Sequence, residues 1–165
     1  MIDRKAARAA AAAAKKEAPV AEDRALAALR RARVGRPALV RTPAGEPAFW
    51  LAPFVSGDLA CGLAHVDLDG RVARIGAFGA GPADRQSWVP LSFFEEAPAG
   101  PLAEIRAAYP GLDLSEPVLS YDASPARWAW RVEATGRRGV EAVAFIGPGG
   151  WYEVRPGQAA GELEG

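Results

Sequence analysis

The only cysteine and the only histidine of the chain, Cys61 and His65, stand four residues apart. A thiol and an imidazole in contact form a nucleophile and its base, and this spacing produces that contact on a helix. On a strand it leaves the two Cα atoms roughly 13 Å apart, at about 3.3 Å per residue. Gly62 and the turn-forming residues 67–70 favour a strand. We therefore predict a core cysteine and a strand histidine rather than a catalytic pair.

Three other groups have the residue types of ligand sites. Asp67 and Asp69, ahead of a glycine, suggest a calcium loop, but the further oxygen ligands and the closing glutamate do not follow, which favours a tight hairpin turn. The glycines of residues 147–150 lack the Gly-Lys-Ser/Thr and the helix that complete a phosphate-binding loop. The adjacent glutamates at 95–96 are expected to be a solvated pair. The sequence thus predicts no catalytic residue, no cofactor and no metal ligand.

Aromatic residues offer the best candidates for partner binding. Most of the five tryptophans are expected in the core, because each buries a large apolar area. Two aromatic residues after a four-residue turn, together with two arginines on another turn, are predicted to form a recognition edge. The first predicted sheet is apolar on both faces and needs a second cover. The predicted partner-binding residues are Trp151, Tyr152, Arg137, Arg138, Phe49 and Trp50.

The 20 basic and 20 acidic residues cancel, but they are unevenly placed. Residues 1–16 hold five cations and one aspartate, which leaves net +4 there and net −4 on residues 17–165. Nucleic acid is therefore expected to bind only through residues 1–16, if at all. The single cysteine excludes an internal disulfide, and neither a bilayer-spanning run nor the apolar core of a signal peptide is present. We expect a cytoplasmic protein.

The fold class predicted is α+β, with two tandem units of one helix packed on a small antiparallel sheet, preceded by an Ala-rich N-terminal helical extension. This basic extension has Asp3 as its N-cap but no large apolar side chain to bury, so we expect it to be solvated. The predicted boundaries are residues 1–20 for the extension, 21–79 for the first unit, 80–100 for the connector, 101–157 for the second unit and 158–165 for a disordered tail.

Within each unit a helix is expected to precede four strands. The first helix begins at Glu22 and is closed by Gly35, with Leu26 and Leu29 on its buried face; the second spans 101–109. The aromatic connector is expected to be pinned to the body. The strands are predicted at 38–41, 48–55, 59–66 and 71–78, and at 117–121, 127–133, 140–146 and 151–155.

Four local matches appear in the same order in both halves of the chain and suggest an internal duplication. They begin at Leu26 and Leu102, at Pro37 and Pro117, at Pro47 and Pro125, and at Ala64 and Ala144, with offsets of 76, 80, 78 and 80 residues. The alternative is two hairpin-rich segments that agree by chance.

One helix on an antiparallel sheet, with an Asp- and Gly-containing turn before the last strand, resembles the PepSY-type repeat. The resemblance lies in Leu102–Gly111 leading into Trp128–Val132 and Ile146–Gly150, and in the turn Val66–Gly70 of the first unit. It implies a non-catalytic module, of a kind that in some proteins acts as an inhibitory or chaperoning pro-segment of secreted peptidases.

Three functions follow from these observations as hypotheses. The first is a non-catalytic protein-binding or assembly module that holds a protein partner, or a second copy of itself, by an apolar sheet face or an exposed strand edge. The second is a small-molecule-binding protein or small enzyme with a cleft between the units, using Asp67, Asp69, Arg71 and Arg74. The third is a nucleic-acid-associated protein that acts through its basic N-terminal tail.

Overall fold

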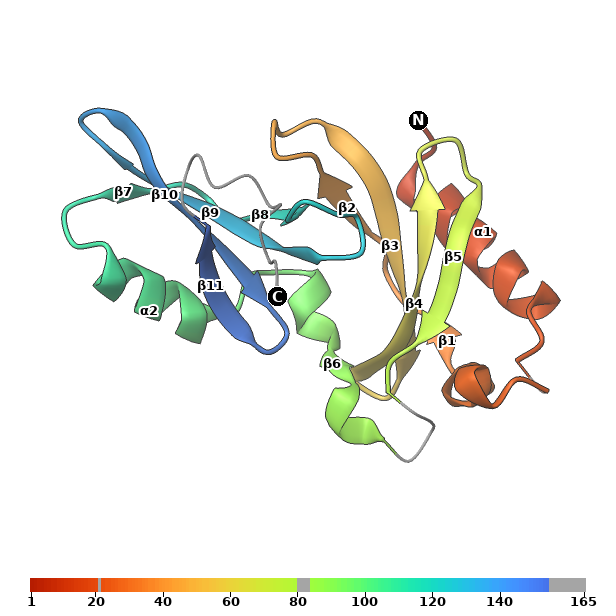
Figure 1. Cartoon of the computed structure of the whole chain (residues 1–165). Helices are drawn as coiled ribbons and strands as arrows, with labels where there is room; N and C mark the ends of the chain where they lie inside the picture. Colours follow the sequence, from red (N-terminus) through yellow and green to blue (C-terminus); the bar gives the residue numbers. More distant parts are fainter. Residues whose placement is uncertain (21, 80–83, 155–165) are drawn as a thin grey trace, which may run out of the picture. The chain divides into compact units, whose positions relative to one another are not determined.

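The computed structural model describes residues 1–20, 22–79 and 84–154, and within them the chain is α+β. It divides into two compact units, one formed by residues 1–40 and 47–96, the other by residues 41–46 and the chain from Ala97 onward. Each unit holds an antiparallel sheet and one α-helix (Figure 1). In the described part of the chain, no helix is long and apolar enough to span a bilayer. The predicted tail 158–165 lies outside the described residues.

Helix α1 (Arg4–Glu17) forms from the Ala-rich segment, and its N-cap is as predicted, because Ala6 N donates to Asp3 Oδ1 at 2.7 Å. The expectation of a solvated extension is wrong. Ala7 and Ala11 are completely buried, and α1 packs on the sheet of the first unit, alongside β5 (Figure 1). A stripe of alanines buries little apolar area, because each side chain is a single methyl group. The small side chains let the helix backbone lie close to the sheet, and the segment becomes part of the core in this way.

The first sheet has the order β1-β3-β4-β5, with β2 also paired to β3 and β6 to β4. Its four longer strands were all predicted from the local sequence pattern, and the two-residue strands were not. The bounds are Arg33–Val34 for β1, Ala38–Arg41 for β2, Pro47–Ser56 for β3, Leu59–Asp67 for β4, Val72–Ala77 for β5 and Val89–Pro90 for β6.

The helix predicted from Glu22 is reduced to the short 3₁₀ helix η1 (Arg24–Leu29). Its two apolar anchors, Leu26 and Leu29, stand three residues apart, which matches the three residues per turn of a 3₁₀ helix and supplies too little apolar surface for a longer α-helix. Leu29 is completely buried against the same core as α1. The helix that covers this sheet is therefore α1.

The connector is tied to the first unit, as predicted. Residues 89–90 pair with β4, and Leu91 N donates to the Asp58 carbonyl at 2.9 Å. Phe93 and Phe94 are buried, and their segment contacts β3. The connector also contains the 3₁₀ helices η2 (Arg85–Ser87) and η3 (Leu91–Phe94), whereas its residues 80–83 lie outside the described chain.

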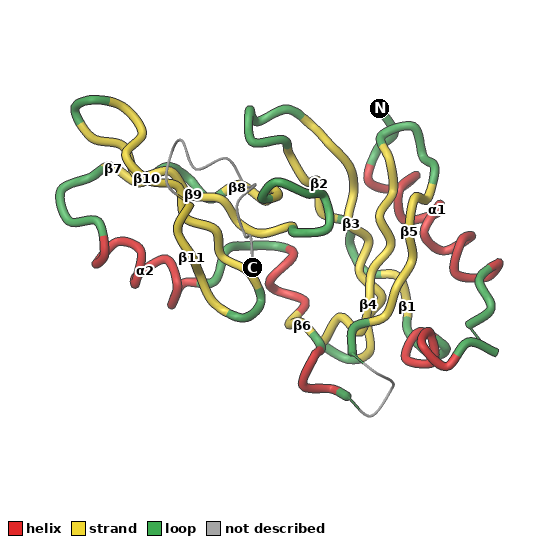
Figure 2. Tube along the Cα trace, viewed as in Figure 1, coloured by secondary structure: helices red, strands yellow, loops and turns green. Residues whose placement is uncertain are grey.

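The second unit places helix α2 (Ala99–Ala108) on a sheet of order β11-β10-β9-β7, with β8 also paired to β9 (Figure 2). Its core contains Ile105 from the helix, with Val132, Ala144 and Ile146 from the strands. The strand bounds are Asp113–Leu114 for β7, Val118–Tyr121 for β8, Trp128–Gly136 for β9, Gly139–Gly147 for β10 and Gly150–Val154 for β11.

Strand pairing follows one pattern in both units. A two-residue strand and a four-residue strand both pair with the first long strand, which forms a hairpin with the second long strand, and the last strand lies beyond it. The predicted helix equivalence is weaker, because its two members are the 3₁₀ helix η1 and the α-helix α2.

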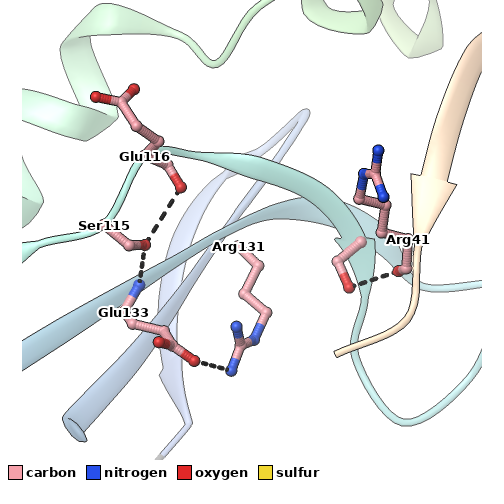
Figure 3. Close-up of polar contacts among 6 residues, drawn as sticks. Arg41, Ser115, Glu116, Arg131 and Glu133 are labelled. Atoms are coloured by element: carbon pink, nitrogen blue, oxygen red, sulfur yellow. Dashed lines mark hydrogen bonds and ion pairs between the residues drawn. The ribbon is translucent and has the colours of Figure 1, made fainter. Parts of the chain in front are cut away.

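Polar contacts within the second unit involve β9, the segment before β8 and the carbonyl of Arg41 (Figure 3). Arg131 and Glu133, both on β9, form an ion pair at 2.5 Å, and Ser115 Oγ accepts from Glu133 N at 2.9 Å. The fully buried Ser120 donates to the Arg41 carbonyl at 2.8 Å, which joins the turn of residues 41–46 to this unit.

Candidate functional site

Cys61 and His65 lie on opposite faces of β4 and form no pair. A register shift between Phe54 and Val55 leaves Cys61 as the extra residue of β4, so its thiol turns toward the core under α1 and donates to the Phe54 carbonyl at 3.3 Å. His65 stacks on Phe49, with ring centroids 4.0 Å apart. Burial raises the pKa of the Cys61 thiol, which keeps it in its unreactive form.

His65 is expected to make the stability of the protein depend on pH. Burial lowers its pKa from the ordinary 6.5, the charge of Asp67 acts in the opposite direction, and Arg74 lowers it further. The unfolded chain therefore takes up the proton first as the pH falls. The free energy of unfolding should be highest above the ordinary pKa and should decline as the pH falls through that value. Urea titrations of the wild type and of His65→Gln measure this, and an equal pH dependence in both would contradict it.

Asp67 and Asp69 form the predicted hairpin turn. Arg71 Nη2 lies 2.6 Å from Asp67 Oδ2, and Arg71 N donates to Asp69 Oδ1 at 2.9 Å. Gly70, at φ +98°, supplies the left-handed residue that the turn requires. Over the described ranges, no group of three or more His, Cys, Asp or Glu side chains is arranged to hold a metal ion.

The predicted recognition edge is not brought together by the second sheet. Trp151 and Tyr152 lie opposite Ile146 and Phe145 on β10, whereas Arg137 and Arg138 are exposed in the β9–β10 turn. Six residues of strand, roughly 20 Å, separate that turn from Phe145. Trp151 packs toward α2, where its Nε1 donates to Glu104 Oε2 at 2.9 Å, and Tyr152 faces the other way.

Tyr152 belongs instead to a polar cluster with a nearly buried carboxylate. Asp122 is 7% exposed; its Oδ2 lies 2.8 Å from Arg127 Nη2 and 3.2 Å from the Tyr152 hydroxyl. The Arg127 guanidinium also lies over the Tyr152 ring, 5.8 Å from its centroid. The carboxylate is thus satisfied by its own neighbours.

Replacing Asp122 by asparagine is expected to lower the pKa of Tyr152. Burial raises this pKa above its ordinary 10.0 and the negative charge of Asp122 adds to the effect, so removing the charge should move the titration back down. Arg127→Gln should move it the other way. Phenolate absorbance across an alkaline titration measures both shifts, and equal curves for all three proteins would show that the cluster has no electrostatic influence on the phenol.

Phe49 and Trp50 are adjacent on β3 and face opposite sides of the first sheet. Trp50 is 6% exposed and packs under α1, where the Arg4 guanidinium lies 6.0 Å from its ring centroid. Phe49 is 3% exposed and stacks on His65. Both rings contribute to burial in the first unit.

One edge of the first sheet, at β1, is closed by side chains from α1. Gly35 N donates to the Pro53 carbonyl, so the alternation of bonded pairs directs the carbonyls of Ala32 and Val34 away from β3. Arg8 Nε donates to the Val34 carbonyl at 3.1 Å, and Lys15 Nζ donates to the Ala32 carbonyl. Two long basic side chains thereby occupy the backbone acceptors of this edge.

The other edge, at β5, is left open by the residues that the structure describes. Phe78 N donates to the Cys61 carbonyl at 2.8 Å, and the same alternation directs the N–H and C=O groups of Ile75 and Ala77 away from β4. Within the described chain, β5 pairs with no strand besides β4. A groove of about 590 Å³ runs between α1 and β5, lined by alanines of the helix, by Val72 and Ile75, and by Glu17 and the exposed Arg74.

A second pocket, of about 450 Å³, lies beside the end of α1 and is lined by Lys15, Lys16 and Arg30 over an apolar floor. Its charge suggests an anion, but two of its three cations, Lys15 and Arg30, already have partners. Lys15 donates to the Ala32 carbonyl, and Arg30 Nε donates to the Val20 carbonyl at 3.0 Å. The open β5 edge is therefore the stronger candidate site.

Sequence reasoning missed this edge, because the predicted strand 71–78 does not reveal what lies on either side of it. An edge strand can be recognised only once the order of the strands in the sheet is known. Comparisons of the chain with protein-family models, curated proteins and solved structures find no match.

Proposed function

We propose that the chain is a non-catalytic protein-binding module that accepts an extended strand of another polypeptide on the β5 edge of its first sheet. The observation that carries the proposal is the difference between the two edges of that sheet. The acceptors of the β1 edge are occupied by Arg8 and Lys15, whereas the backbone groups of Ile75 and Ala77 face outward. Proteins generally protect their strand edges, so an edge left open beside a groove favours strand addition.

The groove beside β5 suits the side chains of an added strand. Ile75 and Ala77 pack toward the α1 side of the sheet, so an incoming strand directs every second side chain to that side. The alanines of α1 leave room for apolar side chains there, and Glu17 offers a negative charge. Backbone hydrogen bonds would supply the affinity of such a complex, and the groove its selectivity.

The two alternative functions have less support. Of the residues considered for a small-molecule site, Asp67, Asp69 and Arg71 hold one another in a hairpin turn. In the basic N-terminal segment, Arg8 and Lys15 donate to backbone carbonyls and Arg4 lies over Trp50. That leaves few cations of α1 for a nucleic acid, which needs several phosphate contacts.

We further propose that the two units descend from one duplicated unit related to the PepSY-type repeat. The shared pairing pattern of the two sheets and the nearly constant offset of the four sequence matches support this origin. A cytoplasmic location remains a prediction from the sequence.

Selection of random eight-residue peptides displayed on phage, against the immobilised full chain, tests the proposed function. The informative variant is Ala77→Pro, because the N–H that proline removes faces away from β4 and makes no bond within the sheet. Ala77→Ser keeps the N–H and is the matched control. Selected peptides should bind the wild type and Ala77→Ser alike and Ala77→Pro at least tenfold more weakly. Peptides that bind all three equally, or no enriched peptide, would refute strand addition at β5.

A further inference from the structure

We infer that the strand added at β5 is the β5 strand of a second copy of this chain, paired antiparallel about Gly76 to form a two-fold dimer. This inference rests on the proposed function and names its partner. Three observations support it. Position 76 is a glycine, the backbone groups on either side of it point outward, and the side chains of β5 fit those of a second, antiparallel β5.

Nothing within the unit requires a glycine at position 76. A Cβ placed there would meet no atom within 4 Å, the backbone φ is not in the left-handed region, and the register with β4 is continuous around it. Gly62 is the opposite case, because a Cβ there would lie 2.3 Å from the Gly76 carbonyl oxygen. A glycine inside a strand weakens it, and such a glycine often marks a bulge or the close approach of a ligand or another backbone. No bulge is present at Gly76, so close approach is the explanation that we adopt.

Pairing about Gly76 uses the outward backbone groups of both Ile75 and Ala77. Ile75 of each copy lies opposite Ala77 of the other, and each such pair exchanges two hydrogen bonds. Gly76 then faces Gly76 of the second copy at a non-bonded position, where the Cα atoms come within about 4.5 Å. Two residues without side chains suit this closest point of the interface.

The side chains agree with the same register. On the α1 side, Ile75 meets Ala77, and apolar groups face each other beside the groove. On the other side, the exposed Arg74 lies opposite Phe78 of the second copy, where a guanidinium and an aromatic ring attract each other. A two-fold interface must be self-complementary in this way.

Two neighbouring two-fold registers, centred on Arg74 and on Ile75, are less favourable. Centring on Arg74 sets two arginines directly opposite each other, which is repulsive. Centring on Ile75 brings Ala73 into the pairing, and Ala73 is the residue that the register shift between β4 and β5 leaves unpaired. That register also places Arg74 opposite Gly76, a difference that an experiment can detect.

Opposite charges introduced at Gly76 test the dimer and its register together. Gly76→Glu and Gly76→Lys both enter open space, so thermal melting should show each variant folded. In the proposed register each variant faces its own copy, so like charges should weaken the dimer at least tenfold, and an equimolar mixture should restore it. In the register centred on Ile75, Gly76→Glu would face Arg74 and tighten the dimer, while Gly76→Lys would loosen it.

Light scattering of the full chain over a concentration series measures the outcome. The expected result is the mass of two chains for the wild type and for the mixture, and the mass of one chain for each variant alone. A wild type that stays at the mass of one chain, or a dimer that neither variant changes, would overturn the inference. If selected peptides still bound the β5 edge of a monomeric chain, the second copy would be the wrong partner while strand addition would stand.

Discussion

Ala11→Glu should unfold the first unit or come close to it. Ala11, on the inner face of α1, is completely buried against the core that contains Trp50 and Val66, and the Arg8 and Lys15 side chains of the adjacent turns are already bonded to backbone carbonyls. An unpaired charge in such a position costs more than about 3 kcal/mol, a large part of the stability of a small domain. Urea denaturation followed by tryptophan fluorescence measures the loss.

Ala9→Glu is the matched control, because Ala9 lies on the exposed side of the same helix. It should change the free energy of unfolding by less than about 0.5 kcal/mol. Equal effects at the two positions would mean that α1 does not cover the sheet, and the solvated extension expected from the sequence would then be right.

Gly62→Ala should destabilise the pairing of β4 with β5. Its Cβ would lie 2.3 Å from the Gly76 carbonyl oxygen and 2.8 Å from Ala77 Cα, and these are backbone atoms that move only if the strand moves. The expected loss is about 3 kcal/mol, the upper part of the range for overpacking. Chemical denaturation of the full chain measures it.

Gly76→Ala provides the contrast on the neighbouring strand. Within one chain the added methyl group meets nothing, and at protein concentrations where the chain is monomeric, replacing a glycine at a compatible strand position is expected to stabilise by about 0.4–1 kcal/mol through the unfolded state. If Gly62→Ala were tolerated as well as Gly76→Ala, the close packing of β4 against β5 would be wrong, and with it the geometry of the open edge.

The strands of this protein are predictable from local pattern, and the helices only in part. The alternation around Trp128 and Trp130 defines β9, and the long apolar run from Phe49 defines β3. A Pro-Gly stop correctly closes α2 near Tyr109. Each of these signals lies within a few residues, so it does not depend on the rest of the fold.

What the sequence does not reveal is which segments cover the sheet. Alanine has high helix propensity and little apolar area, so residues 4–17 resemble a solvated helix until the sheet beneath them is known. Leu26 and Leu29 look like the face of an α-helix, but two anchors three residues apart are equally satisfied by a 3₁₀ turn.

The open edge of β5 could not be predicted from the sequence either, because a local pattern does not reveal which segments lie beside a strand. No residue of β5 is chemically distinctive apart from Arg74, and the edge is defined by the absence of a neighbouring strand among the described residues. The closed edge at β1 depends on contacts between residues 26 and 17 positions apart, Arg8 with Val34 and Lys15 with Ala32. The one indication in the sequence is Gly76, because a glycine inside an otherwise regular strand can mark the close approach of another backbone.

The most direct test of the open edge is amide hydrogen exchange of Ile75 and Ala77, measured by NMR on the full chain at low and at high protein concentration. Outward amides without partners should exchange rapidly in dilute solution and become protected as chains associate, while Arg74 and Gly76, bonded to β4, stay protected throughout. Fast exchange of Ile75 and Ala77 at every concentration, with or without a selected peptide, would contradict strand addition at β5.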